Sequence, residues 1–406
     1  MSILMSQAAL DAKIPGLAAR QCARMHVIHV PRRFVEKDWG GTETSILQTS
    51  RALNARGHAS SIVTTTAMCE QRYEHIQGVD VRRHKYVYPF LGLTDQDKRD
   101  MDHKGGNLWS GALLRNLLTA RNLDILHAHS GKRLGGIVRT AARSRNIPYV
   151  ISLHGGVMDV PEAETRQMLQ PLKGKFEWGR ALGAMVGSRS VLRDASAILC
   201  VGQNEQKAVQ ARYPDSRVEW LPNGVDSAAF SRGDGRAFRE KHGIPHHRHV
   251  IMTLGRIDPQ KNQLALLNAM PGLLGKHPDT HLVLIGPVTA ESYGSQLLQK
   301  INGAGLHDHV TVLPGIPGSS GDLVNALHAA DVFCLPSRHE PFGIVILEAW
   351  AAGLPVVASR VGGVPSFTRD GEDILHADPE SPESFVSCLD LLRSDPQLAG
   401  RIVANG

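Results

Sequence analysis

Short apolar runs rich in β-branched residues alternate with helix-like stretches along most of the chain. In the first half these runs lie at residues 25–30, 60–66, 124–130, 149–155 and 197–202. Strands that alternate with helices indicate a parallel sheet with crossover connections. The first half is therefore predicted to be an α/β unit.

A second series of the same kind follows a break in the pattern. The run at 218–226 contains a Pro-Asn-Gly turn, and a polar stretch at 227–249 comes after it. The new strands are predicted at residues 249–257, 281–287, 309–315, 331–337 and 354–359. These runs are apolar on both alternations, which is typical of strands that helices cover on both faces.

The two series divide the chain, whose 406 residues exceed one ordinary core. We predict a flexible extension at residues 1–24, a first domain at 25–226 and a second domain at 227–406. Doubly wound domains bind ligands beyond the carboxyl ends of their strands, so both domains are expected to face a central cleft. Functional residues are therefore sought just after strands.

Composition and charge narrow the class of partner. Hydrophobic residues make up 42% of the chain, and the net charge of +6 favours nucleotides, phosphorylated lipids or an acidic membrane surface. No motif points to nucleic acid, and no run of 18 apolar residues or secretory signal is present, so a cytoplasmic protein is expected. The five cysteines are scattered, which is typical of reduced, packed thiols.

The strongest chemical signal follows the strand predicted at 331–337. Gly343 begins a helix there, and a free helix N-terminus binds a diphosphate well through its N–H groups and partial positive charge. Glu340 precedes this helix and Glu348 lies within it, so both can border one pocket and contact different ligand hydroxyls. By spacing alone, two solvated surface carboxylates are an equal alternative.

Two cations favour the ligand site over that alternative. Arg256 and Lys261 lie at the end of the strand run that begins at residue 249, where a phosphate is expected. A guanidinium fork and an ammonium group at this place can neutralise a departing diphosphate.

The candidate site residues in the first half of the chain rest on less specific sequence patterns. Gly41 follows another glycine and precedes a helix with Thr42 as its predicted cap, although Gly-Gly is equally typical of a turn. His154 ends a predicted strand at the presumed cleft, where it can bond a sugar hydroxyl or have only a structural role. His127 and His129 have no carboxylate cluster nearby in sequence, so we interpret them as strand and cleft residues and predict no metal site.

Together these elements resemble the family 4 glycosyltransferases of the GT-B fold. The matching segments of the second half are residues 223–226, 255–261, 284–286, 340–348 and 353–359. In the first half, the Gly-Gly-Thr-Glu and His-Gly-Gly elements resemble the family's other domain. The resemblance implies an α/β fold of GT-B type, with two doubly wound Rossmann-like domains facing a central cleft. The N-terminal domain would bind the acceptor, and the C-terminal domain would bind the nucleotide-sugar donor.

The resemblance also implies residue roles. Glu348 would hold ribose hydroxyls, Glu340 would contact the donor sugar, and His154 would contact the sugar being transferred. The implied catalytic set is Glu340, His154, Arg256 and Lys261, of which the two cations would stabilise the departing diphosphate. The implied donor-binding set is Gly41, Arg256, Lys261, Gly286, Glu340, Phe342, Gly343, Ile344 and Glu348.

The implied reaction retains anomeric configuration and needs no metal or other cofactor. In the family's usual scheme the leaving phosphate deprotonates the acceptor, while the protein positions the substrates and stabilises charge. Ser366, where the family often has an acidic residue, and Ile374, where it has a glycine, leave the base and sugar unassigned. Because the architecture normally returns a C-terminal helix to the first lobe, a chain ending at Gly406 is expected to be truncated.

One further segment bears on where the acceptor is bound. Residues 173–193 place Trp178, Leu182, Met185 and Val186 at helical spacing among basic residues. Such a helix can dock on an acidic membrane or pack its apolar face into the core. We predict transfer from a nucleotide diphosphate sugar, UDP rather than GDP, to a glycan or lipid-linked acceptor of cell-envelope or exopolysaccharide synthesis. The protein would make peripheral contact with the inner face of the plasma membrane.

Alternative functions differ in what they require. A nicotinamide-dependent oxidoreductase would need a Gly-x-Gly-x-x-Gly turn after a strand, and none is present. A GT-B epimerase needs no acceptor, and a phosphorylase-like enzyme needs only orthophosphate. A non-catalytic nucleotide-sugar binding protein is usually marked by loss of Glu340 or Lys261, and both are present.

Overall fold

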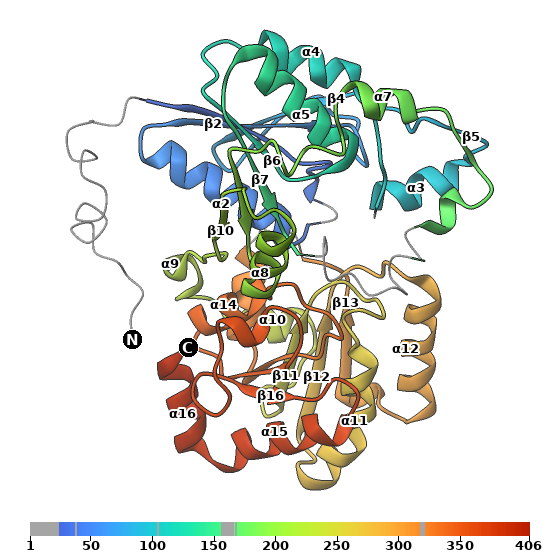
Figure 1. The fold of residues 1–406 in the computed structure, drawn as a ribbon. Coiled ribbons are helices and arrows are strands. Elements are labelled where there is room, and N and C mark those ends of the chain that lie inside the picture. Colours follow the sequence, from blue (N-terminus) through green and yellow to red (C-terminus); the bar gives the residue numbers. More distant parts are fainter. Residues whose placement is uncertain (1–23, 37–38, 104, 156–165, 167–168, 317–320) are drawn as a thin grey trace.

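The computed structural model describes residues 24–36, 39–103, 105–155, 166, 169–316 and 321–406. Within these ranges the chain forms two lobes, each built on one large sheet (Figure 1). The predicted flexible extension at 1–24 lies outside the described residues except for Arg24. The predicted domain junction at 226–227 falls at the start of α9 (Ser227–Phe230), between the two sheets, and stays a prediction.

The first sheet has eight strands in the order β10-β9-β7-β6-β1-β2-β4-β3. Their bounds are β1 (His26–Val30), β2 (Ala59–Thr65), β3 (Tyr73–Ile76), β4 (Val79–His84), β6 (Ile125–Ala128), β7 (Tyr149–Leu153), β9 (Ala197–Cys200) and β10 (Val218–Trp220). Every pairing is parallel except that of β3 with β4. Five of these strands match the predicted apolar runs. The pair β3–β4 was missed because its residues alternate between buried and exposed positions near the sheet edge and include several charges.

Helices cover this sheet on both faces. They are α2 (Gly41–Ala55), α3 (Asp95–His103), α4 (Gly111–Thr119), α5 (Lys132–Arg145), α7 (Arg180–Met185) and α8 (Gln203–Arg212), with a 3-10 turn η2 (Gln170–Leu172). A small two-stranded sheet pairs β5 (Phe90–Leu91) with β8 (Phe176–Glu177) at one side of the lobe.

Two local predictions are wrong in this lobe. Residues 173–193 do not form one helix, because the segment pairs first as strand β8 and only then forms the six-residue helix α7. Gly174 and Gly187 adopt left-handed φ values of 72° and 61°, which interrupt helical geometry. Thr42 does not cap α2 either, since the helix begins at Gly41 and no side chain caps it.

The second sheet has six parallel strands in the order β13-β12-β11-β14-β15-β16. Their bounds are β11 (His249–Leu254), β12 (Thr280–Ile285), β13 (Val310–Leu313), β14 (Val332–Leu335), β15 (Val356–Ser359) and β16 (Leu375–Ala377). All six residues of β12 are buried, as its unbroken apolar run predicts. The three-residue β16 at the sheet edge was missed, because it is too short to show a pattern.

Apolar clusters fill both faces of this sheet beneath its helices. The helices are α9, α10 (Gly235–Lys241), α11 (Gln263–Lys276), α12 (Glu291–Gly303), α13 (Gly321–His328), α14 (Ile344–Ala351), α15 (Pro382–Ser394) and α16 (Pro396–Asn405), with 3-10 turns η3 (His307–His309) and η4 (Val364–Ser366). In Figure 1, α14 lies at the top of this lobe, toward the first lobe.

The strand orders confirm two doubly wound sheets and identify where each binds ligands. Connections reverse direction between β1 and β6 in the first sheet and between β11 and β14 in the second. In such sheets ligands bind beyond the carboxyl ends of the strands at the reversal point. The fold thus directs attention to the residues that follow these four strands.

Two further observations concern the expected cellular setting. No disulfide joins the cysteines of the described ranges, Cys69, Cys200, Cys334 and Cys388, and Cys22 lies outside those ranges. Among the helices that the structure describes, none is long and apolar enough to span a membrane.

Candidate active site

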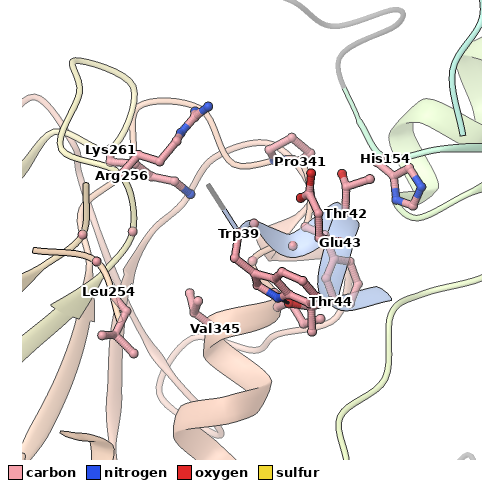
Figure 2. Close-up of a pocket in the computed structure, with 18 of the residues that line it drawn as sticks. Trp39, Thr42, Glu43, Thr44, His154, Leu254, Arg256, Lys261, Pro341 and Val345 are labelled. Carbon is pink, nitrogen blue, oxygen red and sulfur yellow. Dashed lines mark hydrogen bonds between the residues drawn. The ribbon is translucent and has the colours of Figure 1, made fainter. Parts of the chain in front are cut away.

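A cavity of about 490 Å³ lies between the lobes and is lined by residues of both. All ten residues that the sequence singled out border it: Gly41, His154, Arg256, Lys261, Gly286, Glu340, Phe342, Gly343, Ile344 and Glu348. Figure 2 shows Arg256 and Lys261 on one side of the cavity and His154 on the other, with Thr42 and Glu43 between them. The structure therefore brings the predicted residues together, while their chemical roles stay predictions.

The N-terminus of α14 forms one corner of this cavity. Gly343 precedes the helix with φ 93° and ψ 55°, a left-handed conformation that favours glycine. No side chain caps the helix, and its first turn carries no acidic residue. The first N–H groups of the helix, together with its partial positive charge, can therefore hold a phosphate.

Lys261 and Glu340 form an ion pair at the cavity wall. The Lys261 Nζ lies 2.6 Å from Glu340 Oε2, and the Ser337 hydroxyl donates to the same oxygen at 3.2 Å. Both charged side chains are largely shielded from water, with 17% and 8% of their surfaces exposed. The pair holds the ammonium group in a fixed place, and the charge of Glu340 is offset by a cation.

Arg256 is anchored by its own loop. Its Nη2 lies 3.1 Å from Asp258 Oδ2 and donates to Gln260 Oε1 at 3.1 Å, while the Gln263 amide donates to its backbone carbonyl at 2.8 Å. These contacts use one terminal nitrogen, and no residue in the described ranges accepts from Nη1. The guanidinium can therefore offer a second N–H edge to a ligand in the cavity.

Glu348 contributes a buried carboxyl group at the edge of the cavity. It is 6% exposed, and burial raises its pKa to about 7. Hydrogen bonds donated by ligand hydroxyls would stabilise its ionised form and lower this pKa again. The carboxyl group is thus suited to receive a diol.

Close backbone contacts bring the loops around Glu340 together. A Cβ on Gly155, which has φ +85°, would lie 1.9 Å from the Pro341 Cβ. A Cβ on Gly362 would lie 2.1 Å from the Glu340 carbonyl oxygen. Only glycine permits such approaches, so these positions let a first-lobe loop and a second-lobe loop both pack against residues 340–341.

His154 lies just after β7 and is bonded to another imidazole. Its Nε2 lies 2.8 Å from His129 Nδ1, and burial lowers the pKa of His154 to about 4. The side chain is therefore a neutral imidazole at neutral pH. His129 also lines the cavity, as its interpretation as a cleft residue predicts.

Some residues that line the cavity were not predicted from the sequence. Trp39 precedes α2 and donates from Nε1 to Thr44 Oγ1 at 2.9 Å. Glu43 is a third buried glutamate of the lining, in addition to Glu340 and Glu348, at 6% exposure. Glu43 belongs to the Gly-Gly-Thr-Glu element, but nothing in the spacing shows that the side chain is buried. Arg32 and Arg33 line the first-lobe side of the cavity. They belong to the basic loop after β1, and the charge of this loop is the sequence feature that could have identified them.

Two family models together match most of the chain. The model for glycosyl transferases group 1 matches residues 234–406, and the model for glycosyltransferase family 4 matches residues 39–229. A D-inositol 3-phosphate glycosyltransferase from Mycolicibacterium gilvum is 30% identical over 374 residues, covering 90% of this chain and 80% of that protein. A protein of the same name from Nocardioides is 30% identical over 388 residues, with the same coverage.

Solved structures share the fold at lower identity. HepE of Anabaena, in complex with UDP and glucose, has a TM-score of 0.70 at 20% identity, covering 94% of this chain and 93% of its own. Sucrose-phosphate synthase from Thermosynechococcus elongatus has a TM-score of 0.68 at 20% identity, with the same coverage. These similarities confirm the two-lobed α/β architecture.

Proposed function

Because the chain belongs to the family 4 glycosyltransferases of the GT-B fold, we propose that it transfers a sugar from a nucleotide diphosphate donor with retention of anomeric configuration. The resemblance stated from the sequence motifs is thereby confirmed, and the protein is a glycosyltransferase. One observation carries the finer proposal: the cavity places a free helix N-terminus and two cations beside buried carboxyl groups. That arrangement suits a diphosphate flanked by hydroxyl-rich groups.

The donor would lie along the second-lobe side of the cavity. Its diphosphate would face the N-terminus of α14 with Arg256 and Lys261, and its ribose hydroxyls would donate to Glu348. Gly41, whose Cβ position lies only 3.3 Å from the Ile344 side chain, would let the first lobe approach the same phosphates. UDP is proposed over GDP as the nucleotide.

The chemical step needs no side-chain nucleophile. Lys261 and Ser337 both bind Oε2 of Glu340, and the proposal gives this carboxylate the role of holding Lys261 rather than of forming a covalent bond. The bond from the anomeric carbon to the diphosphate breaks, the acceptor oxygen attacks on the same face, and the acceptor proton passes to the leaving phosphate oxygen. Arg256, Lys261 and the helix N-terminus stabilise the negative charge that develops on that phosphate. No metal ion is proposed.

For the acceptor, we propose a glycan or lipid-linked sugar of cell-envelope or exopolysaccharide synthesis. A small phosphorylated polyol is the second candidate, since the relatives named above are D-inositol 3-phosphate glycosyltransferases. Arg32 and Arg33 on the first-lobe side of the cavity favour an anionic group there. Arg32 donates to the carbonyls of Met101 and Asp102 at 2.9 and 2.7 Å, which holds its guanidinium in place.

We further propose peripheral contact with an acidic membrane at its cytoplasmic face. Leu91 and Phe176 lie opposite each other on β5 and β8 and are 60% and 66% exposed. Trp178 and Met185 are also exposed, and the basic residues Lys173, Arg180 and Arg189 lie in the same segment. We call Leu91, Phe176, Trp178 and Met185 the apolar patch. Val186, by contrast, is buried in the core.

The reaction can be tested with UDP-glucose as donor and D-inositol 3-phosphate or an isoprenoid-phosphate-linked glycan as acceptor. Proton NMR of the product would report the anomeric coupling, and the proposal predicts the anomer of the donor. An inverted product would contradict retention. Conversion of donor without any acceptor would indicate an epimerase, and turnover with orthophosphate alone would indicate a phosphorylase.

A further inference from the structure

Four histidines gather at the carboxyl ends of β1, β6 and β7, at and next to the reversal point of the first sheet. His29 lies on β1 and is directly paired with His127 on β6, while His129 follows β6 and His154 follows β7. His29, His127 and His129 pack their rings against one another, with centroids 4.1 to 5.2 Å apart. The resemblance to the family implies that His154 contacts the sugar being transferred, whereas the other three histidines have no role in the chemistry proposed above.

Three of these rings form a hydrogen-bonded chain that leads to the cavity. His29 Nδ1 lies 3.0 Å from His129 Nε2, and His129 Nδ1 lies 2.8 Å from His154 Nε2. A neutral imidazole has one N–H donor and one acceptor nitrogen. Since both nitrogens of His129 are used, the position of one proton in the chain determines the position of the others.

Burial keeps the chain neutral. It lowers the pKa of His29 and of His154 to about 4, and it lowers the pKa of His129 well below the usual value. The same holds for His127, whose Nε2 is bonded to Ser152 Oγ at 2.7 Å outside the chain. Near neutral pH the four rings therefore keep the same charge, and only the direction of their hydrogen bonds can differ.

The inner end of the chain indicates that direction. His29 Nε2 is buried and meets no hydrogen-bond partner in the described part of the protein. Buried N–H groups without an acceptor are rarer than buried acceptors without a donor. The proton of His29 is therefore placed on Nδ1, from which it is donated to His129 Nε2. His129 then donates from Nδ1 to His154 Nε2, which leaves the proton of His154 on its Nδ1.

Resting on the function proposed above, we propose that His29 and His129 are positioning residues that hold His154 as its Nδ1–H tautomer, a neutral donor to a hydroxyl of the transferred sugar. His154 lines the cavity, and within the described ranges no protein group bonds its Nδ1. The N–H is thus available to substrate. A wrong tautomer would present a lone pair instead, which cannot donate to a sugar oxygen.

A matched pair of substitutions at His129 separates hydrogen-bond direction from packing. In His129→Asn the amide nitrogen takes the place of Nδ1 and still donates to His154. In His129→Asp only acceptor oxygens stand there, so the proton of His154 must move to Nε2. The two side chains are nearly equal in size, so packing alone predicts similar effects, but Asp adds a negative charge, and the tautomer spectrum rather than the rate is therefore the deciding measurement.

Nitrogen NMR of protein labelled at histidine reads the tautomer directly, with melting temperatures as a check on folding. We expect His154 to be the Nδ1–H tautomer in the wild type and in His129→Asn, and to carry its proton on Nε2 in His129→Asp. For transfer or hydrolysis of UDP-glucose, His129→Asp should lose kcat about ten-fold more than His129→Asn, the value of one hydrogen bond, with a smaller change in KM.

Two results would overturn the proposal. One is a wild-type spectrum with His154 protonated on Nε2, which decides the matter even if His129→Asp fails to fold. The other is stoichiometric Zn²⁺ binding that requires His129, because a metal would displace the ring-to-ring bonds. The tautomer spectrum needs no turnover, so absence of transfer with every donor would count against the proposed function alone. Normal transfer with the wrong tautomer would count against the histidine chain alone.

Discussion

A carboxyl group buried beside an empty cavity costs free energy whenever it is ionised, and Glu348 is in this position. Its pKa is raised from 4.5 to about 7, so the folded protein binds this proton more firmly than the unfolded chain. The stabilisation by that proton is complete below about pH 4.5 and is lost as the pH rises through 7. Glu348 thus lowers the stability of the protein at alkaline pH, which is the cost of keeping the proposed ribose-binding group buried.

Replacing Glu348 by Gln should therefore stabilise the ligand-free protein as the pH rises. Between pH 4 and pH 8 the advantage of Glu348→Gln over the wild type should grow by up to about 3 kcal/mol, the upper limit set by the pKa shift. Urea unfolding at several pH values measures it. Glu291→Gln, at an exposed position on α12, is the control and should show no such trend. A pH-independent difference for Glu348→Gln would refute the account of its burial.

The same residue shows what sequence can and cannot reveal. Helix spacing places Glu348 near Glu340 but does not distinguish a buried carboxylate from a solvated one. Burial depends on contacts between segments far apart in the chain, such as those that Gly155 and Gly362 make with residues 340–341 at the same cavity. Likewise, the histidine chain joins three strands, so His127 and His129 viewed alone indicated only strand and cleft positions.

At the scale of elements, the loop after β7 packs against the loop before α14. The close approach of Gly155 to Pro341 joins first-lobe and second-lobe segments that both border the cavity. Any side chain at position 155 would push these loops apart. The spacing between His154 and the N-terminus of α14, the proposed phosphate site, should therefore depend on this glycine.

The variant Gly155→Ala tests that dependence, and Gly57→Ala serves as its control. Both glycines have φ near +85° (85° and 84°), but a Cβ on Gly57 meets nothing within 4 Å. Both variants should lose about 1 kcal/mol of stability through the left-handed backbone, and Gly155→Ala should lose more because its Cβ would overlap Pro341. Only Gly155→Ala should also lower kcat/KM for UDP-glucose, by about ten-fold or more, since small misplacements at a reacting centre are costly. Equal kinetics for the two variants would show that this contact does not set the site geometry.

The apolar patch on β5, β8 and α7 gives a second prediction at this scale. Burying one large apolar side chain is worth about 1.5–3 kcal/mol. Phe176→Ser combined with Trp178→Ser should therefore weaken flotation with phosphatidylglycerol vesicles at least about ten-fold. Leu298→Ser, at a 54% exposed position on α12, should leave flotation unchanged. Equal loss in both variants, or no binding by the wild type, would exclude the patch as the docking surface.

Strands with a clear apolar pattern were predictable from the sequence. Strands that form only because they pair with a distant segment were not. The buried strands, such as β12, carry unbroken apolar runs, and their order follows from the doubly wound topology. The segment at 173–193 has helical spacing, yet β8 pairs with β5 more than 80 residues away in sequence, as the contact of Leu91 with Phe176 shows. Tertiary pairing overrode a weak local preference there.

At the scale of the whole molecule, the two doubly wound lobes border one cavity at their facing strand ends, and we propose this cavity as the donor site. The second lobe supplies the N-terminus of α14 and the residues after β11 and β14, and the first lobe supplies His154 and Gly41. The protein is a glycosyltransferase by family, so the open question of mechanism concerns which groups hold the donor diphosphate. Lys261 tests this most sharply, because the ion pair with Glu340 fixes it at the cavity wall.

Calorimetric titration of UDP and GDP into the wild type, Lys261→Ala and Lys276→Ala is that test. Lys276 pairs with Asp390 at an exposed site of the same lobe and serves as the control. We expect UDP to bind the wild type more tightly than GDP, Lys276→Ala to match it, and Lys261→Ala to bind UDP at least about ten-fold more weakly, the value of a charge-assisted hydrogen bond. Undiminished UDP binding by folded Lys261→Ala, or no nucleotide binding by the folded wild type, would contradict the donor site described here.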